Sequence, residues 1–119
     1  MTTQIRDAVL SFYETVDTRA PHDVVALFSP TAVYRRPGYE PMRGAAELLA
    51  FYGGGRVIAA GAHTIETVVV DGDRAAVQGR FDGVLRDGQQ IRLRFADFFC
   101  FEAGGLVAER DTYFDAPAV

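Results

Sequence analysis

The sequence predicts an α+β fold, with three helices in its first half and a curved antiparallel sheet in its second half. Three observations lead to this prediction. Apolar residues recur at helical spacing near the N-terminus, tight-turn signals dominate after position 60, and long segments between those turns alternate as strands do. The chain has 119 residues, which fits one core. We therefore expect a single domain over residues 1–119.

The first helix is the most clearly patterned element. Thr2 or Thr3 can cap its N-terminus, because a hydroxyl there accepts a hydrogen bond from a free backbone N–H. The pattern continues to about Asp17. The apolar positions that recur at helical spacing are Ile5, Val9, Phe12 and Val16. This spacing predicts an amphipathic helix that buries one face.

The rest of the first half is expected to alternate between short elements. Pro21 suits a first helical turn and opens a helix over 22–28, which the Ser-Pro pair at 29–30 ends. The elements expected next are a strand over 32–34, a turn-rich loop over 37–41 and a helix over 44–52 that a glycine triplet ends.

Four strands are expected from Ala62 onward, joined by turns that contain glycine. They cover 62–70, 74–86, 89–102 and 106–115. A long curved sheet that wraps around a helix encloses a cone with one open mouth. Such an interior can hold a small molecule.

Composition and charge exclude several classes of function. The net charge is −4 and the basic residues are scattered, which disfavours a nucleic-acid surface. No apolar run is long enough for a membrane span, and the N-terminus lacks a signal-peptide pattern, so we expect a cytoplasmic protein. The two histidines and one cysteine have no metal-ligand spacing. We expect neither a metal nor a cofactor.

A carboxylate stands in the middle of an apolar strand face. The odd positions over 89–102 share one face, and all of them except Asp97 are apolar. Burial would raise the pKa of Asp97, and a neutral carboxyl can donate a hydrogen bond to a developing oxyanion. The alternative is a structural carboxylate that pairs with an arginine such as Arg80 or Arg94.

Two other strands carry candidate acids and bases. Strict alternation places Asp111 and Tyr113 on the face that can point into the cavity, where Asp111 can act as a general base. The alternative is a carboxylate on a solvated strand face. Arg80 and Asp82 also share a face, and an arginine between carboxylates can keep one ionised and another protonated. Alternation alone favours a solvent-exposed position for this second pair.

Three further residues are weaker candidates. Tyr34 can donate its hydroxyl into the pocket from the short strand. His63 begins a strand and is expected at the mouth or on the surface. Whether Arg36 and His63 enter the cavity stays open; there Arg36 would favour an anionic group on the ligand.

The chain resembles the NTF2-like superfamily over nearly its whole length. Residues 24–34 look like the second helix and first strand of that superfamily, and residues 97–115 look like its closing hairpin. The resemblance implies a single cone-shaped domain in which three N-terminal helices pack in a curved antiparallel sheet. The side chains expected to line its pocket are Tyr34, Arg36, Tyr113, Phe95, Phe99, Phe12 and His63.

Two enzyme branches of the superfamily imply different roles for the aspartates. In the ketosteroid isomerase branch Asp97 falls at the protonated oxyanion-hole aspartate. However, Arg36 stands at the position of the base, and Phe12 at that of the catalytic tyrosine.

Limonene epoxide hydrolases use an Asp–Arg–Asp set. The resemblance to them implies Asp111 as base, Asp82 as acid and Arg80 as the bridge between them. It also implies that Tyr34 helps to hold the water, although Arg36 replaces a water-holding asparagine.

A third branch, the SnoaL-like polyketide cyclases, implies acid–base work by Asp111 alone. Together, residues and resemblance predict a cofactor-free acid–base enzyme for a small hydrophobic metabolite, with epoxide opening as its most specific form. Cyclisation, isomerisation and a non-catalytic binding or dimerisation module are the alternatives. A homodimer is expected through the outer sheet face, where we place Ala96, Phe98, Cys100 and Phe114.

Overall fold

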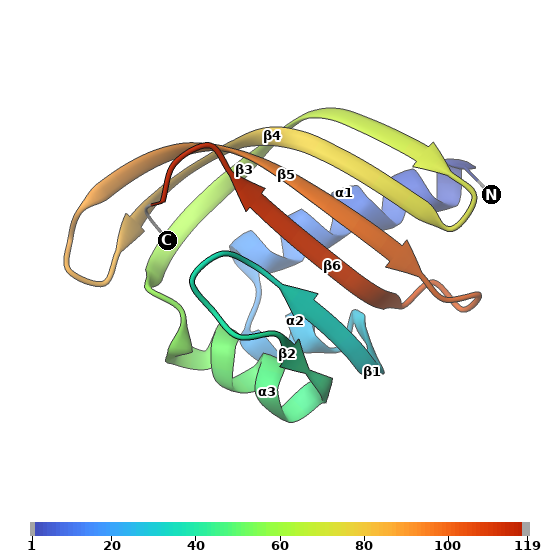
Figure 1. The fold of residues 1–119 in the computed structure, drawn as a ribbon, viewed down its shortest axis with the longest axis horizontal. Coiled ribbons are helices and arrows are strands. Elements are labelled where there is room, and N and C mark those ends of the chain that lie inside the picture. Colours follow the sequence, from blue (N-terminus) through green and yellow to red (C-terminus); the bar gives the residue numbers. More distant parts are fainter. Residues whose placement is uncertain (1, 118–119) are drawn as a thin grey trace.

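The structure, a computed structural model, describes residues 2–117 as one curved sheet with helices on its inner side (Figure 1). This confirms the α+β prediction. In chain order the helical and strand elements of the first half are α1 (Thr2–Thr18), α2 (Pro21–Val25), β1 (Phe28–Arg35), β2 (Met42–Arg43), α3 (Gly44–Ala50) and the π-helical turn η1 (Phe51–Gly55). Those of the second half are β3 (Ile58–Asp71), β4 (Arg74–Leu85), β5 (Gln90–Phe101) and β6 (Val107–Phe114).

The sheet has the strand order β2-β1-β6-β5-β4-β3. All neighbouring strands are antiparallel except β1 and β6, which run parallel. The expectation of a wholly antiparallel sheet was therefore wrong at this one pair. Glycine turns identify the hairpins among β3, β4, β5 and β6, but no turn connects β1 to β6, so the sequence gives no local signal for their pairing.

The second helix is shorter than expected. α2 ends at Val25, and β1 already begins at Phe28, so the Ser-Pro pair at 29–30 lies inside a strand. The pairing of β1 with β6 is irregular between Phe28 and Val33, and an irregular strand tolerates a proline. The other large difference is that β3 begins at Ile58, earlier than the expected strand.

The helix α1 packs along the concave side of the sheet and lies behind it in Figure 1. Its buried stripe includes Val9, Phe12 and Tyr13, all at most 2% exposed. The Phe12 ring meets the rings of Phe28 and Phe99 edge to face, with centroids 5.5 and 5.3 Å apart. Each such buried side chain stabilises the fold by about 1.5–3 kcal/mol, so this packing holds α1 against the sheet.

Candidate functional site

A buried ion pair occupies the centre of the inner sheet face. Asp97 on β5 is fully buried, and its Oδ2 accepts a hydrogen bond from Nη2 of Arg110 on β6 at 2.9 Å. The Tyr13 hydroxyl on α1 donates to the same oxygen at 2.5 Å, and Thr112 donates to Oδ1. The strand register explains the cluster, because Asp97 lies opposite Thr112 and Phe99 lies opposite Arg110.

This cluster keeps Asp97 ionised. Burial alone raises the pKa of Asp97, but the charge of Arg110 and the hydrogen bonds from Arg110, Thr112 and Tyr13 outweigh burial and lower it. Burial, reinforced by the Asp97 charge, raises the pKa of Tyr13 well above its usual value, so Tyr13 remains a donor. The prediction of a protonated Asp97 was therefore wrong. The structural alternative holds, with Arg110 as the partner.

A directed chain of hydrogen bonds leads from this ion pair to Arg36. Thr112 donates to Asp97, so its oxygen accepts from the Tyr34 hydroxyl, 2.8 Å away. The Tyr34 oxygen in turn accepts from Nη1 of Arg36 at 3.1 Å. Arg110 donates its Nη1 to the Tyr52 hydroxyl at 2.9 Å. Arginine only donates and an ionised carboxylate only accepts, so the direction of each bond follows from these two kinds of group.

Two more arginines reach the interior. Arg36 is only 8% exposed, and two of its donor atoms, Nε and Nη2, have no hydrogen-bond partner within residues 2–117. Aromatic rings surround its guanidinium carbon at 5.2–5.9 Å: Tyr34, Tyr39, Phe51 and Phe114. Arg56 is half-buried with its guanidinium carbon 5.4 Å from the Tyr52 ring centroid, and burial lowers its pKa.

A histidine–carboxylate pair joins α1 to β3. Asp17 Oδ1 lies 2.6 Å from Nδ1 of His63, and Asp17 Oδ2 accepts the backbone N–H of His63 at 2.8 Å. Both side chains are largely buried, at 14% and 11% exposed. A carboxylate can only accept here, so the ring proton is on Nδ1 and Nε2 is the basic nitrogen.

The interior cavity is small. Its volume is about 20 Å³, which is room for one water. Its lining combines apolar and charged side chains: Val16, Arg36, Tyr52, Arg56, Ile58, His63, Phe81, Phe95, Asp97, Arg110, Thr112 and Phe114. A surface pocket of about 170 Å³ adjoins it and includes Asp17. Four side chains line both spaces and separate them: Val16, Arg56, Ile58 and Phe81.

The sequence profile of the SnoaL-like domain matches residues 9–110, which is most of the chain. The chain belongs to the SnoaL-like domain family. No curated protein matches the sequence.

Solved structures share the SnoaL-like fold. An NTF2-like protein of unknown function from Burkholderia pseudomallei is 21% identical, with 94% of this chain and 91% of that chain covered and a TM-score of 0.82. A putative SnoaL-like polyketide cyclase from Jannaschia sp. is 22% identical, with 95% and 86% covered and a TM-score of 0.80. An LEH-like epoxide hydrolase from M. tuberculosis is 17% identical, with 95% and 84% covered and a TM-score of 0.81. At these identities the similarity shows the NTF2-like fold alone.

The SnoaL-like interior contains several of the residues selected from sequence. Asp97, Arg36, His63 and Phe95 line the cavity. This settles the open question about Arg36, and it places His63 deeper than expected. Tyr34, Phe12 and Phe99, also expected to line the pocket, are buried in the core but do not line the cavity.

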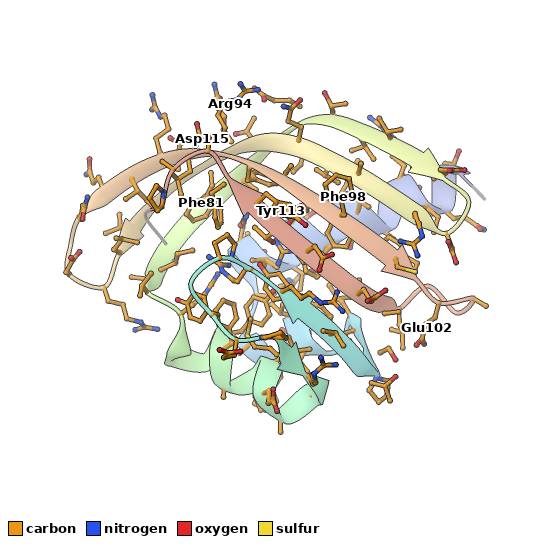
Figure 2. All side chains as sticks on the ribbon, viewed as in Figure 1. Phe81, Arg94, Phe98, Glu102, Tyr113 and Asp115 are labelled. Atoms are coloured by element: carbon orange, nitrogen blue, oxygen red, sulfur yellow. The ribbon has the colours of Figure 1, made fainter. Side chains whose placement is uncertain are left out.

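Asp111 and Tyr113 point the other way. Asp111 pairs with Arg35 at 3.0 Å on the outer sheet face, and Tyr113 is 55% exposed there (Figure 2). The prediction that both point into the cavity was wrong. Phe114, expected on the outer face, lines the cavity instead. The cause is an irregularity in the β5–β6 register next to Cys100, which shifts the alternation of β6.

Arg80 and Asp82 also lie outside the cone. Arg80 is exposed, and Asp82 pairs with Arg92 at 2.6 Å across two exposed side chains. Alternation alone placed them correctly, and the inward orientation implied by the epoxide hydrolase resemblance was wrong. Asp97 is thus separated by the sheet from Asp82 and Asp111, and the expected set of converging carboxylates does not form.

Sequence reasoning missed six polar or charged residues of the interior, which are Tyr13, Asp17, Tyr52, Arg56, Arg110 and Thr112. A usable signal existed for Tyr13, because it lies four residues after Val9 on the apolar stripe of α1. No local sequence pattern indicates the pairing of Asp17 with His63, which are 46 positions apart.

Within residues 2–117 there is no helix long and apolar enough to cross a membrane, and no cluster of metal-binding side chains.

Proposed function

We propose that this SnoaL-like domain is an acid–base enzyme for a small molecule bound inside the cone, with His63 as its general base. The observation that supports this most is the 2.6 Å contact between Asp17 and Nδ1 of a histidine that lines the cavity. Histidine exchanges protons near neutral pH, and a carboxylate on Nδ1 stabilises the imidazolium that forms when Nε2 takes a proton.

Asp97 is a poor base in this arrangement. Both of its oxygens already accept hydrogen bonds, and Arg110 helps to keep its pKa low. A carboxylate in that state gains little by taking a substrate proton. Its contribution is to hold Arg110 and the hydroxyls of Tyr13 and Thr112 in fixed positions.

The arginines suit a reaction that develops negative charge on oxygen. Abstraction of a proton from a carbon next to a carbonyl produces an enolate, and Arg36 and Arg56 are cations on the same cavity wall as His63. Fixed cations stabilise such charge most where water is excluded. This favours a cyclase- or isomerase-type reaction. Epoxide opening has less support, because Asp82, Arg80 and Asp111 lie outside.

The test is proton exchange in deuterium oxide, followed by NMR on a panel of small ketones and 1,3-dicarbonyl compounds. We expect the wild-type protein to accelerate exchange, and His63→Asn to slow it by about 10²–10⁴-fold. Asp17→Asn should lie between the two. His22→Asn is the matched control, because His22 is exposed on α2 and should leave the rate unchanged. Equal rates for His63→Asn and wild type would contradict the proposal.

A non-catalytic binding module is the second candidate. The cavity volume of about 20 Å³ requires side chains to move before a metabolite can enter, and this applies to both candidates. The binding module is favoured by Nε and Nη2 of Arg36, which are buried without a partner within residues 2–117 and can hold a ligand without any chemistry. It predicts no exchange with any compound of the panel, and ligand affinities that do not depend on Asp17.

A further inference from the structure

The charges on the cavity wall do not balance. The wall carries the guanidinium groups of Arg36, Arg56 and Arg110 and the single carboxylate of Asp97. Asp97 pairs with Arg110 and with no other arginine, so two positive charges remain. Within residues 2–117 no carboxylate forms an ion pair with Arg36 or Arg56. A buried cation without a counterion is unfavourable unless something else supplies the charge.

The unpartnered atoms of Arg36 indicate the shape of the missing anion. Nη1 is occupied by Tyr34, while Nε and Nη2 are buried and have no partner within residues 2–117. These two nitrogens form one edge of the planar guanidinium group. That edge presents two parallel N–H groups, which is the geometry that binds both oxygens of a carboxylate.

The surroundings fix the orientation of this edge. The rings of Tyr39, Phe51 and Phe114 lie within 5.2–5.4 Å of the Arg36 guanidinium carbon. Aromatic rings favour the cation but accept no strong hydrogen bonds, so they leave its N–H groups unsatisfied. The packing therefore orients Arg36 at an energetic cost that a bound anion would relieve.

We propose that the ligand is a small organic acid whose carboxylate binds to Arg36, assisted by Arg56. The cavity of about 20 Å³ suits a head group rather than a whole molecule. The body of the acid would reach the adjoining pocket of about 170 Å³ where the separating side chains, Arg56 among them, move aside. That pocket is lined by Asp17 and Arg19 as well as by Val16, Ile58 and Phe81. The binding of an acid stands by itself, and only its role as substrate rests on the proposed function.

Binding can be measured without turnover by calorimetry with benzoate and its neutral counterpart benzamide. We expect benzoate to bind at least tenfold more tightly than benzamide. Arg36→Met keeps the length of the side chain and removes the charged edge, and Arg56→Met does the same at the second position. Each should weaken benzoate binding at least tenfold and leave benzamide binding unchanged.

The matched control is Arg94→Met. Arg94 is exposed and projects from the sheet on the side away from the helices (Figure 2), so the variant has the same change in net charge without altering the cavity. It should bind benzoate as the wild type does. Equal affinities for benzoate and benzamide, or equal benzoate affinities for Arg36→Met and Arg94→Met, would overturn the proposal. Inorganic phosphate that binds as tightly as benzoate would also overturn it, since the site would then not select carboxylates.

Two more measurements separate the outcomes. Ligand-free Arg36→Met should melt at the same temperature as the wild type or higher, because an unbalanced buried cation is removed; a purely structural Arg36 would give a lower melting temperature. His22→Asn, on the exposed side of α2, should bind benzoate with wild-type affinity. Loss of exchange activity in His63→Asn together with unchanged benzoate binding in Arg36→Met would leave the enzyme proposal standing and reject the acid ligand.

Discussion

At the scale of single residues, Arg110 connects more of the interior than any other side chain described above. Its guanidinium donates to Asp97 and Tyr52, and its central carbon lies 4.9 and 4.6 Å from the ring centroids of Phe12 and Tyr34. A buried ion pair adds little net stability, because both charges lose their hydration. The removal of one partner is different, since the other charge then stays buried and unpaired.

We predict that Arg110→Met lowers the free energy of unfolding by about 3–5 kcal/mol, because it leaves the Asp97 carboxylate without its cation. Urea unfolding measures the change. The control is Arg92→Met, which removes an ion pair between exposed side chains and should cost about 1 kcal/mol or less. Similar losses of unfolding free energy in the two variants would show that the buried ion pair matters no more to stability than the exposed one.

The charge of Asp97 also predicts how the stability of the protein depends on pH. The pKa of Asp97 is lowered in the folded protein, so the pairing contributes stability above its unfolded pKa of about 4. That contribution is lost as the pH falls from about 4 through the folded value. The stability difference between wild type and Asp97→Asn should be constant from pH 7 to 5 and shrink below about pH 4. A difference that shrinks between pH 7 and 5 would mean that Asp97 is protonated there.

At the scale of elements, the register of β6 determines which of the predicted side-chain orientations were correct. Cys100 pairs with Glu109 and Phe101 pairs with Val107, which leaves Ala108 as an extra residue. Val107 faces inward, yet the next inward residue is Arg110 rather than Glu109. One extra residue moves every later side chain to the opposite face, and nothing in the local alternation reveals it.

Elements with a local sequence signal were the ones that could be predicted. Hairpins were readable because glycine turns mark them, and α1 was readable because its stripe follows helical spacing. Asp97 was placed correctly because β5 alternates regularly through it. Its charge state was missed because its partner, Arg110, lies on the shifted strand. The contact between Asp17 and His63 forms only when α1 packs against β3. Residues so far apart in the sequence give no local signal of that packing.

A close backbone approach within the sheet gives a prediction at this scale. A Cβ added to Gly79 on β4 would lie 2.1 Å from the backbone oxygen of Thr64 on β3. Neither strand can move without breaking its ladder, so Gly79→Ala should destabilise the protein by about 1–3 kcal/mol. Gly104→Ala is the control, because a Cβ there meets no atom within 4 Å. Thermal unfolding compares them, and equal melting temperatures would contradict the prediction.

At the scale of the whole molecule, the outer sheet face has an apolar centre. Phe98 and Tyr113 are 52% and 55% exposed, and their rings meet edge to face at 5.9 Å on the side opposite α1 (Figure 2). The strand register continues the strip through Ala76 to Val69, which is 58% exposed. Exposed apolar surface of this kind is typical of a binding face.

We propose that this strip is the centre of a homodimer interface. Charged side chains of both signs flank it, Arg74 and Arg94 along with Glu109 and Asp111. A two-fold axis through the strip would bring each patch against its own copy, where opposite charges can face one another. The arrangement needs no residue from the cavity, so dimerisation and the proposed chemistry can be tested separately.

Sedimentation equilibrium provides that test. The wild-type protein should sediment as two copies, and Phe98→Glu as one, because the variant places a carboxylate at the centre of the strip, where burial of an unpaired charge is costly. Leu10→Glu is the control: Leu10 is 40% exposed on α1, away from the outer sheet face, so this variant should remain a dimer. A wild-type monomer, or a Phe98→Glu dimer, would show that the exposed strip does not join two copies. If Phe98→Glu is monomeric, as expected, and also keeps its proton-exchange rate, the catalytic interior is complete within one chain.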